Sequence, residues 1–139
     1  VAELKNKDKK IIFTNGCFDI LHTGHVRYLE KTKSFGDILI LGLNSDNSVR
    51  KLKGEKSPIN SQVDRAYILA SLEVIDYVVI FDDDTPYDLI NLIQPDVLVK
   101  GGDYEGKEIV GQGIAKELKL VKFIDNKSST QIIERIQKS

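Results

Sequence analysis

Two histidines three residues apart are the strongest candidates for reactive side chains in this sequence. His22 and His25 belong to the stretch His-Thr-Gly-His, they are the only histidines of the chain, and an apolar run over residues 11–13 precedes them. We expect a strand followed by a helix here, and the N-terminus of a helix presents unpaired N–H groups that favour phosphate. Gly24 would let a ligand approach the backbone closely. This pattern suits binding a triphosphate and stabilising the charge that develops when it is attacked.

The residues alone leave other interpretations of these histidines open. Both side chains could be structural, as helix caps or surface residues. A zinc site would need three or four ligands, and only Cys17 and Asp19 are near. A Cys17 nucleophile paired with His22 would lack a third, orienting group, and cysteine is commonly a small buried residue.

Basic residues further along the chain could supply cations to a phosphate site. Lys51 and Lys53 fall in an expected loop bounded by glycine and proline, where they could close over phosphates or remain solvated. Arg65 interrupts an apolar helical segment, either as a rigid cation for phosphate or as a side chain that extends to solvent. Lys100 ends an apolar strand before two glycines, which favours a ligand contact. Asp103 follows these glycines and could bind a ribose or a base.

Two other polar stretches are ambiguous. Ser129 and Thr130 stand at an expected helix start, where they can cap the helix while its N–H groups bind an anion. Asp82, Asp83 and Asp84 precede another expected helix, where acidic side chains complement the helix dipole. We interpret these aspartates as solvated, so the sequence leaves the protein ligands of any metal unknown.

The elements that must position these residues alternate along the whole chain. Apolar runs without polar alternation are typical of strands buried on both faces, and helix-periodic segments separate them. This order predicts an α/β fold with a parallel sheet covered by helices, and ligands bind such sheets at the carboxyl ends of the strands. The expected strands are residues 10–14, 38–43, 77–81, 97–100 and 120–124, and the expected helices are residues 24–35, 61–72, 86–93, 111–118 and 130–137.

Composition narrows the class of protein. The 139 residues, of which 41% are hydrophobic and 29% charged, suit one domain over residues 1–139, with polar residues 1–9 as a leader or linker. A net charge of −1 argues against a nucleic-acid partner. The single cysteine excludes an internal disulfide, and no apolar run approaches the ~20 residues that cross a bilayer. We therefore expect a cytoplasmic location and no membrane partner.

The histidine turn resembles that of the nucleotidyltransferase superfamily, which includes cytidylyltransferases and phosphopantetheine adenylyltransferase. The two common phosphate loops, G-x-G-x-x-G and G-x-x-x-x-G-K-[ST], are absent, which argues against a dinucleotide-binding dehydrogenase or a P-loop enzyme. Over nearly the whole chain the sequence resembles a narrower family, the D-glycero-β-D-manno-heptose 1-phosphate adenylyltransferase domain of the bifunctional heptose enzymes. The segments that carry this resemblance are residues 14–29, 43–46, 49–54, 58–60, 81–86, 95–104 and 109–111.

The resemblance implies a Rossmann-like, doubly wound, five-stranded parallel sheet with helices on both faces. It also implies transfer of AMP from ATP to the heptose 1-phosphate, which gives ADP-heptose and pyrophosphate for the lipopolysaccharide core. Mg²⁺ would arrive with ATP. The resemblance is also compatible with a homodimer and with a heptose kinase, either fused to this chain or separate. The implied catalytic residues are His22, His25 and Lys53; those for the nucleotide are Gly16, Cys17, Phe18, Gly24, Asp103, Ser129 and Thr130; those for substrate phosphate are Lys51, Arg65 and Lys100.

The sequence departs from the superfamily in its second phosphate-binding motif. Cytidylyltransferases commonly carry an arginine in a second phosphate motif, but residues 125–130 have none, and only Lys127 could replace it. The missing arginine argues against the direct contacts that cytidylyltransferases make with this motif. Two alternative functions are nevertheless kept: a cytidylyltransferase acting on an alcohol phosphate, and a nucleotide-binding module without catalysis.

Overall fold

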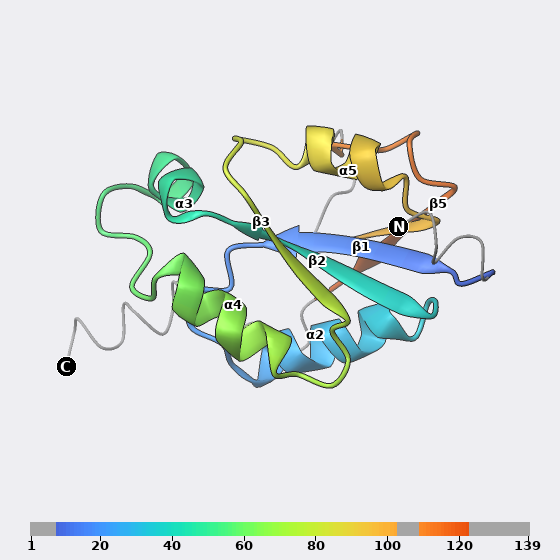
Figure 1. Ribbon diagram of the computed structural model, residues 1–139, viewed down its shortest axis with the longest axis horizontal. Coiled ribbons are helices and arrows are strands. Elements are labelled where there is room, and N and C mark those ends of the chain that lie inside the picture. The colour runs from blue at the N-terminus through green and yellow to red at the C-terminus, as the bar shows by residue number, and fades with distance from the viewer. Residues whose placement is uncertain (1–7, 103–108, 123–139) are drawn as a thin grey trace.

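The computed structural model describes residues 8–102 and 109–122 and shows a parallel sheet of five strands (Figure 1). The strands lie in the order β3-β2-β1-β4-β5, so the order reverses between β1 and β4. This arrangement confirms the doubly wound α/β sheet. The strands are β1 (Ile11–Gly16), β2 (Ile38–Asn44), β3 (Tyr77–Phe81), β4 (Val97–Gly101) and β5 (Glu117–Val121).

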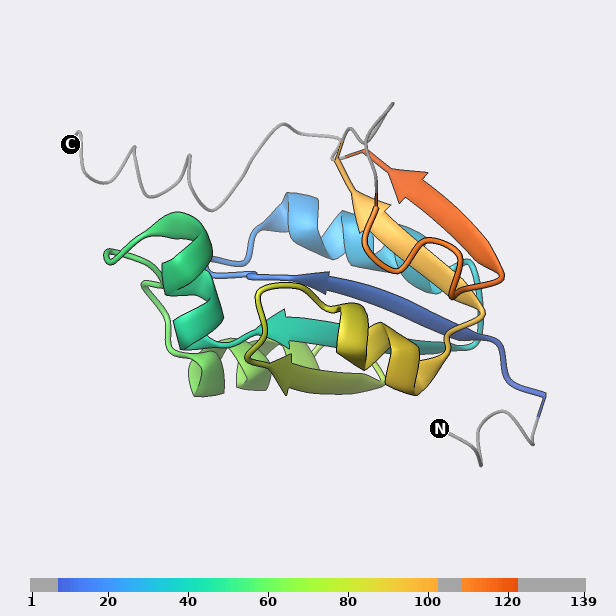
Figure 2. The same cartoon turned by 90° about the horizontal axis from the view of Figure 1, so that it is seen from above.

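Helices cover both faces of the sheet, as Figures 1 and 2 show. On one face pack α2 (Thr23–Lys33) and α4 (Gln62–Ala70), and on the other packs α5 (Tyr87–Ile93). Each face has its own buried apolar cluster, because alternate side chains of a strand point to opposite faces. The first cluster joins Leu29 and Leu69 to the sheet, and the second joins Ile90 to it.

A short helix, α3 (Asp46–Lys53), occupies a segment that the sequence analysis treated as a loop. Ser45 caps it by accepting a hydrogen bond from the backbone N–H of Ser48, and Asp46 complements its dipole. Only two of its eight residues, Val49 and Leu52, are apolar, and so polar a composition favours a loop. In Figure 1, α3 lies beyond the carboxyl ends of β1 and β2, so the helix stands at the edge where ligands are expected.

The expected helix over residues 111–118 is wrong. Gly111 and Gly113 adopt φ values of +86° and +99°, which are left-handed conformations that interrupt a helix. Residues 110–114 form turns instead, and β5 begins at Glu117, three residues before its predicted start. The expected helix over residues 130–137 lies outside the described residues.

Burial differs between the central and the edge strands. Strands β1, β2 and β4 are largely buried, as predicted. The edge strands β3 and β5 are not buried on both faces, since Tyr77 is 50% exposed and Leu120 48% exposed. Among the helices of the described residues, none has the length and apolar character needed to cross a bilayer.

Candidate active site

The turn that joins β1 to α2 carries the two histidines to the carboxyl end of the central strand. Phe18 turns the chain with a left-handed φ of 46°, and His22 is the N-cap residue of α2. The order of the sheet reverses beside β1, between β1 and β4. The histidines therefore lie at the switch point where open α/β sheets bind their ligands.

His22 and His25 cap the helix reciprocally through their own side chains. The backbone N–H of Gly24 donates to His22 Nδ1 at 3.1 Å, and the backbone N–H of His22 donates to His25 Nδ1 at 3.2 Å. These bonds satisfy two backbone N–H groups at the N-terminus of the helix, where such groups have no partner within the helix. The structural role considered for these histidines is therefore present, and it uses the Nδ1 atom of each ring.

The same two bonds fix the tautomer of each neutral ring. A nitrogen that accepts a hydrogen bond carries no hydrogen, so Nδ1 is the acceptor and Nε2–H the donor in both His22 and His25. The rings stack with centroids 3.9 Å apart and planes inclined by 27°. The two imidazoles are thus held together, each with its hydrogen on Nε2.

His25 is held in its neutral form. The pKa of His25 is lowered to about 4, mainly by burial and in smaller part by the neighbouring His22 and Lys53. The ring of Phe18 packs edge-on against it at 5.3 Å between centroids. A neutral imidazole carries no net charge and has one N–H group, which can donate a hydrogen bond to an anion.

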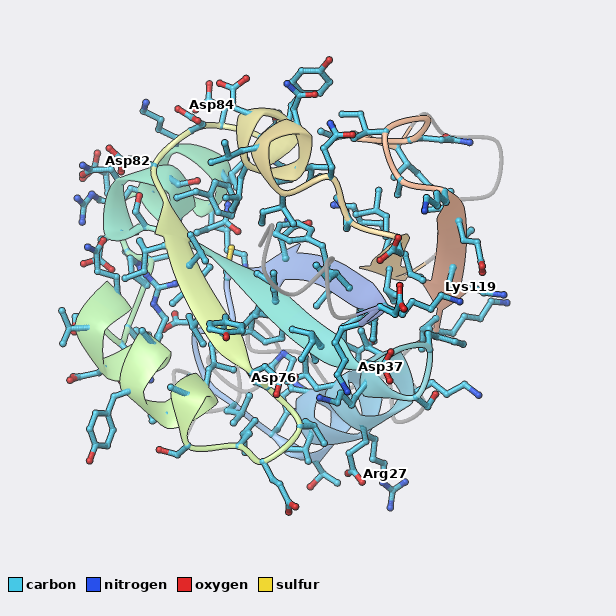
Figure 3. All side chains as sticks on the ribbon, turned by 45° about the vertical axis from the view of Figure 1, so that its right-hand side comes forward. Arg27, Asp37, Asp76, Asp82, Asp84 and Lys119 are labelled. Atoms are coloured by element: carbon cyan, nitrogen blue, oxygen red, sulfur yellow. The ribbon has the colours of Figure 1, made fainter. Side chains whose placement is uncertain are left out.

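Among the described residues, Cys17 and the acidic side chains show neither a favoured thiolate nor a metal-binding cluster. Burial raises the pKa of the Cys17 thiol, which opposes the thiolate that a nucleophile or a zinc ligand needs. In the part of the chain that the structure describes, no three His, Cys, Asp or Glu side chains come together to hold a metal ion. Asp82 accepts a hydrogen bond from Ser45, and Figure 3 shows Asp82 and Asp84 on the turn that follows β3.

Lys100 is a buried cation beside the same strand end. Its side chain donates a hydrogen bond to the amide oxygen of Asn15, which joins the carboxyl ends of β4 and β1. Lys100 is only 7% exposed, and burial lowers its pKa to about 8. No carboxylate within the described ranges forms an ion pair with Lys100. An anionic ligand would therefore offset the free-energy cost of burying its charge.

The two lysines of α3 differ in their surroundings. Lys51 forms an exposed ion pair with Asp84 at 3.8 Å. The charge of Lys53 instead acts on both Cys17 and His25. The helix therefore turns Lys53, rather than Lys51, toward the histidines, because residues two apart lie on different sides of a helix.

Arg65 occupies a different environment from the one that the sequence suggested. Its side chain is fully buried, and it pairs with Asp46 on α3 at 2.8 Å. Its Nε and Nη1 groups donate to the backbone carbonyls of Cys17, Asn44 and Asn60. The guanidinium does not extend to solvent, and four of its five N–H groups bind protein. A contact from Arg65 to a phosphate, as predicted, stays a prediction.

The described residues bring together most of the predicted site. Gly16, Cys17, Phe18, Gly24 and the two histidines share the β1–α2 turn, and Lys53 and Lys100 approach it from α3 and β4. Asp103, Ser129 and Thr130 lie outside the described residues. The sequence analysis missed Asn15, the partner of Lys100, and Asn60, whose backbone binds Arg65. Their signal was slight, because an asparagine near a turn is common.

Comparison of the sequence with known proteins identifies a family and several similar proteins. Residues 13–137 match the family described as cytidylyltransferase-like. The chain is 71% identical over 99% of its length to the bifunctional protein HldE of Aliarcobacter butzleri, and 55% identical over 98% to that of Helicobacter pylori J99. It spans only 29% of the length of each of these relatives.

Solved structures show the same fold. A lipopolysaccharide core biosynthesis protein from Thermoplasma volcanium superposes with a TM-score of 0.71 at 25% identity, covering 84% of this chain and 99% of that one. A pantoate-beta-alanine ligase from Francisella tularensis shares the fold, with a TM-score of 0.59 at 16% identity over 96% of this chain and 72% of that one. Since the family match extends from β1 across all the described strands, the chain belongs to the cytidylyltransferase-like family.

Proposed function

We propose that this chain transfers AMP from ATP to D-glycero-β-D-manno-heptose 1-phosphate, giving ADP-heptose and pyrophosphate. The observation that carries the nucleotidyl transfer is the pair of stacked imidazoles, in which backbone hydrogen bonds to Nδ1 leave Nε2–H as the donor of each ring. The sugar substrate is supported by the resemblance over nearly the whole chain and by the identity to HldE proteins.

The proposed reaction is a single in-line displacement. A phosphate oxygen of the sugar 1-phosphate attacks the α-phosphorus of ATP and forms the new P–O bond. The bond from this phosphorus to the oxygen that bridges to the β-phosphate breaks, and pyrophosphate leaves with the electron pair. The attacking oxygen is already anionic, so no general base is required, and catalysis consists of positioning and charge stabilisation.

The chain's own residues supply these two effects. His22 and His25 would donate through Nε2 to the α-phosphate, where negative charge concentrates as the fifth oxygen approaches. Lys53 would add a positive charge on the side of α3, and Lys100 would hold the sugar phosphate from β4. Gly16, Cys17, Phe18 and Gly24 line the same turn, as the backbone of a phosphate loop does.

The residues present suit Mg²⁺ bound mainly by the nucleotide. No cluster of three protein ligands occurs in the described ranges, and Mg²⁺ in such enzymes is commonly held by substrate phosphates with few carboxylates. When bound, Mg²⁺ supplies charge that neutralises the departing pyrophosphate. Asp103, Ser129 and Thr130 complete the proposed nucleotide contacts.

A substrate panel tests the proposal. Pyrophosphate release is measured with ATP and with CTP against both anomers of the heptose 1-phosphate and against glycerol 3-phosphate. We expect release only with ATP and the β-anomer, together with ADP-heptose in the mass spectrum. Release with CTP and an alcohol phosphate would replace this function by the cytidylyltransferase that the family description favours. Nucleotide binding without release in any combination would leave a binding module.

The wider setting of the reaction is part of the proposal. The relatives named bifunctional are more than three times as long as the region they share with this chain, which leaves room for the heptose kinase that the resemblance implies. We further propose that the reaction takes place in the cytoplasm, where ATP is available. Assembly as a homodimer stays a prediction, which light scattering of the purified chain would test.

A further inference from the structure

A side-chain network behind the histidine turn links it to the segment that leads into α4. The carboxylate of Asp19 accepts hydrogen bonds from the backbone N–H groups of Ile59 and Asn60, at 2.7 and 2.8 Å. The side-chain amide of Asn60 returns a bond to the backbone oxygen of Asp19 at 2.7 Å. Asp19 is 4% exposed, so these bonds are formed in a buried setting where they are well defined.

Arg65 ties the same turn to two further segments. Its Nη1 donates to the carbonyl oxygens of Cys17 and Asn44, both at 2.8 Å, and its Nη2 donates to Asp46 at 2.8 Å. Its Nε donates to the carbonyl oxygen of Asn60 at 3.0 Å. One rigid guanidinium therefore sets the turn after β1 relative to the end of β2, the start of α3 and the entry to α4.

The bond to Cys17 also fixes the direction of the next backbone donor. A trans peptide is planar, and its C=O and N–H point in opposite directions. The peptide between Cys17 and Phe18 directs its oxygen to Arg65, so its N–H, which belongs to Phe18, points away from the guanidinium. A cation on the oxygen polarises the peptide and makes this N–H a stronger donor.

We propose that Arg65 is a positioning residue, which holds the Cys17–Phe18 peptide so that the N–H of Phe18 donates to a phosphate of the nucleotide. The inference deepens the proposed function, on which it rests for the identity of the ligand as a triphosphate. It also explains why a cation is buried at this position. A packed apolar side chain would serve stability as well, but it would set neither the angle nor the polarity of the peptide.

The experiment uses the ¹⁵N-labelled chain and inorganic triphosphate as the probe. In the unsubstituted protein the amide proton of Phe18 is expected to shift downfield as triphosphate is added, because it enters a hydrogen bond to an anion. Arg65→Lys keeps the charge but loses the fork that reaches three carbonyls. In this variant we expect the Phe18 shift to be lost and kcat to fall about 10- to 100-fold. The reason is that misplacing a hydrogen-bond donor lowers the rate almost as much as removing it.

Arg27→Lys is the matched control. Arg27 is an exposed residue of α2 whose side chain points outward from the molecule in Figure 3, so its replacement is expected to leave the Phe18 shift and kcat unchanged. Circular dichroism and a cooperative thermal transition establish that each variant is folded. Arg65→Gln, which can still donate to one carbonyl, is the second variant if Arg65→Lys does not fold.

The outcomes separate this inference from the proposed function. A Phe18 amide that does not respond to triphosphate in the unsubstituted chain overturns the inference, whatever the variants do. A folded Arg65→Lys protein that keeps the Phe18 shift and the full kcat overturns it as well. A normal Phe18 shift that Arg65→Lys abolishes, in a chain that releases no pyrophosphate from any substrate pair, supports the inference while the proposed function fails.

Discussion

His25 accepts a hydrogen bond from the backbone N–H of His22 through Nδ1, the ring nitrogen that protonation would occupy. A proton on Nδ1 would face the N–H group of His22, so that two donors would meet without an acceptor. The hydrogen bond would break, and the reciprocal cap of α2 would be lost. The low pKa of His25, about 4, has burial as its main cause, and this bond acts in the same direction. The same hydrogen bond therefore caps the helix and favours the neutral form of the His25 ring.

Acid is expected to destabilise the protein through His25. Its pKa is near 6.5 when unfolded and about 4 when folded, so the unfolded chain binds more protons between these values. The stability contributed by the neutral ring is present above pH 6.5 and is lost as the pH falls toward 4, by up to about 1.4 kcal/mol per pH unit for one proton. Urea unfolding at pH 7, 6, 5 and 4.5 measures this slope.

His25→Gln isolates the histidine from the carboxylates that also titrate in acid. Glutamine can still accept a hydrogen bond but does not titrate, so the free energy of unfolding should vary less between pH 6.5 and 5 than in the unsubstituted protein. Equal slopes in the two proteins would mean that His25 is not the group responsible.

The two functions of His22 can be separated by substitution. His22→Ala removes both the cap and the Nε2 donor, and it should cost about 0.5–2 kcal/mol of stability. His22→Ser keeps a good N-cap oxygen and should recover most of that stability. Both variants should lose about 10²–10³ in kcat, as when one donor of an oxyanion site is removed.

Chemical unfolding and steady-state pyrophosphate release provide the two readouts for His22. If His22→Ser restored kcat together with stability, the histidine would act only as a cap, and the proposed catalytic role would have to be abandoned.

Lys53 and Lys51 form a natural comparison on one helix. The charge of Lys53 acts on His25, whereas Lys51 pairs with Asp84 in solvent. Lys53→Ala is expected to lower kcat by about 10²-fold, because a fixed charge near the developing phosphate charge is lost. Lys51→Ala should change kcat far less, since exposed ion pairs contribute at most about 1 kcal/mol. Similar losses in both variants would show that α3 contributes only general positive charge.

The sequence predicted the elements whose signal is local and repeated. The central strands β1, β2 and β4 are continuous apolar runs, and they were placed to within two residues at each end. Strand β5 was placed three residues late, because its register is set by pairing with β4, where Glu117 lies opposite Val97. The edge position admits charged residues, so apolar content does not mark where this strand begins.

The part of the site that lies within one short segment could be predicted from the sequence. The histidine turn combines cap, glycine and donor residues within four positions, and the structure assembles it as a unit. Arg65 shows the opposite case. Three of the four groups that its guanidinium binds are backbone carbonyls, which every residue has, so no side-chain pattern in the sequence could indicate them.

Lys100 offers the last test, because burial lowers its pKa into a range that binding experiments can cover. With a pKa of about 8 in the free protein, the ammonium loses its charge as the pH rises through that value. Affinity for an anion beside β4 should therefore fall above pH 8. Sulfate is a suitable probe, because its own charge is constant from pH 6 to 10.

Two substitutions of Lys100 give opposite expectations. Lys100→Arg stays charged throughout this range, so its affinity for sulfate should not decline above pH 8. Lys100→Met should bind weakly at every pH, yet at pH 7 its stability should be unchanged or higher, because a buried charge without a carboxylate partner has been removed. Calorimetric titration with sulfate and thermal unfolding provide the measurements. A decline above pH 8 that persisted in Lys100→Arg would assign the pH dependence to another group and leave Lys100 without its proposed role at the sugar phosphate.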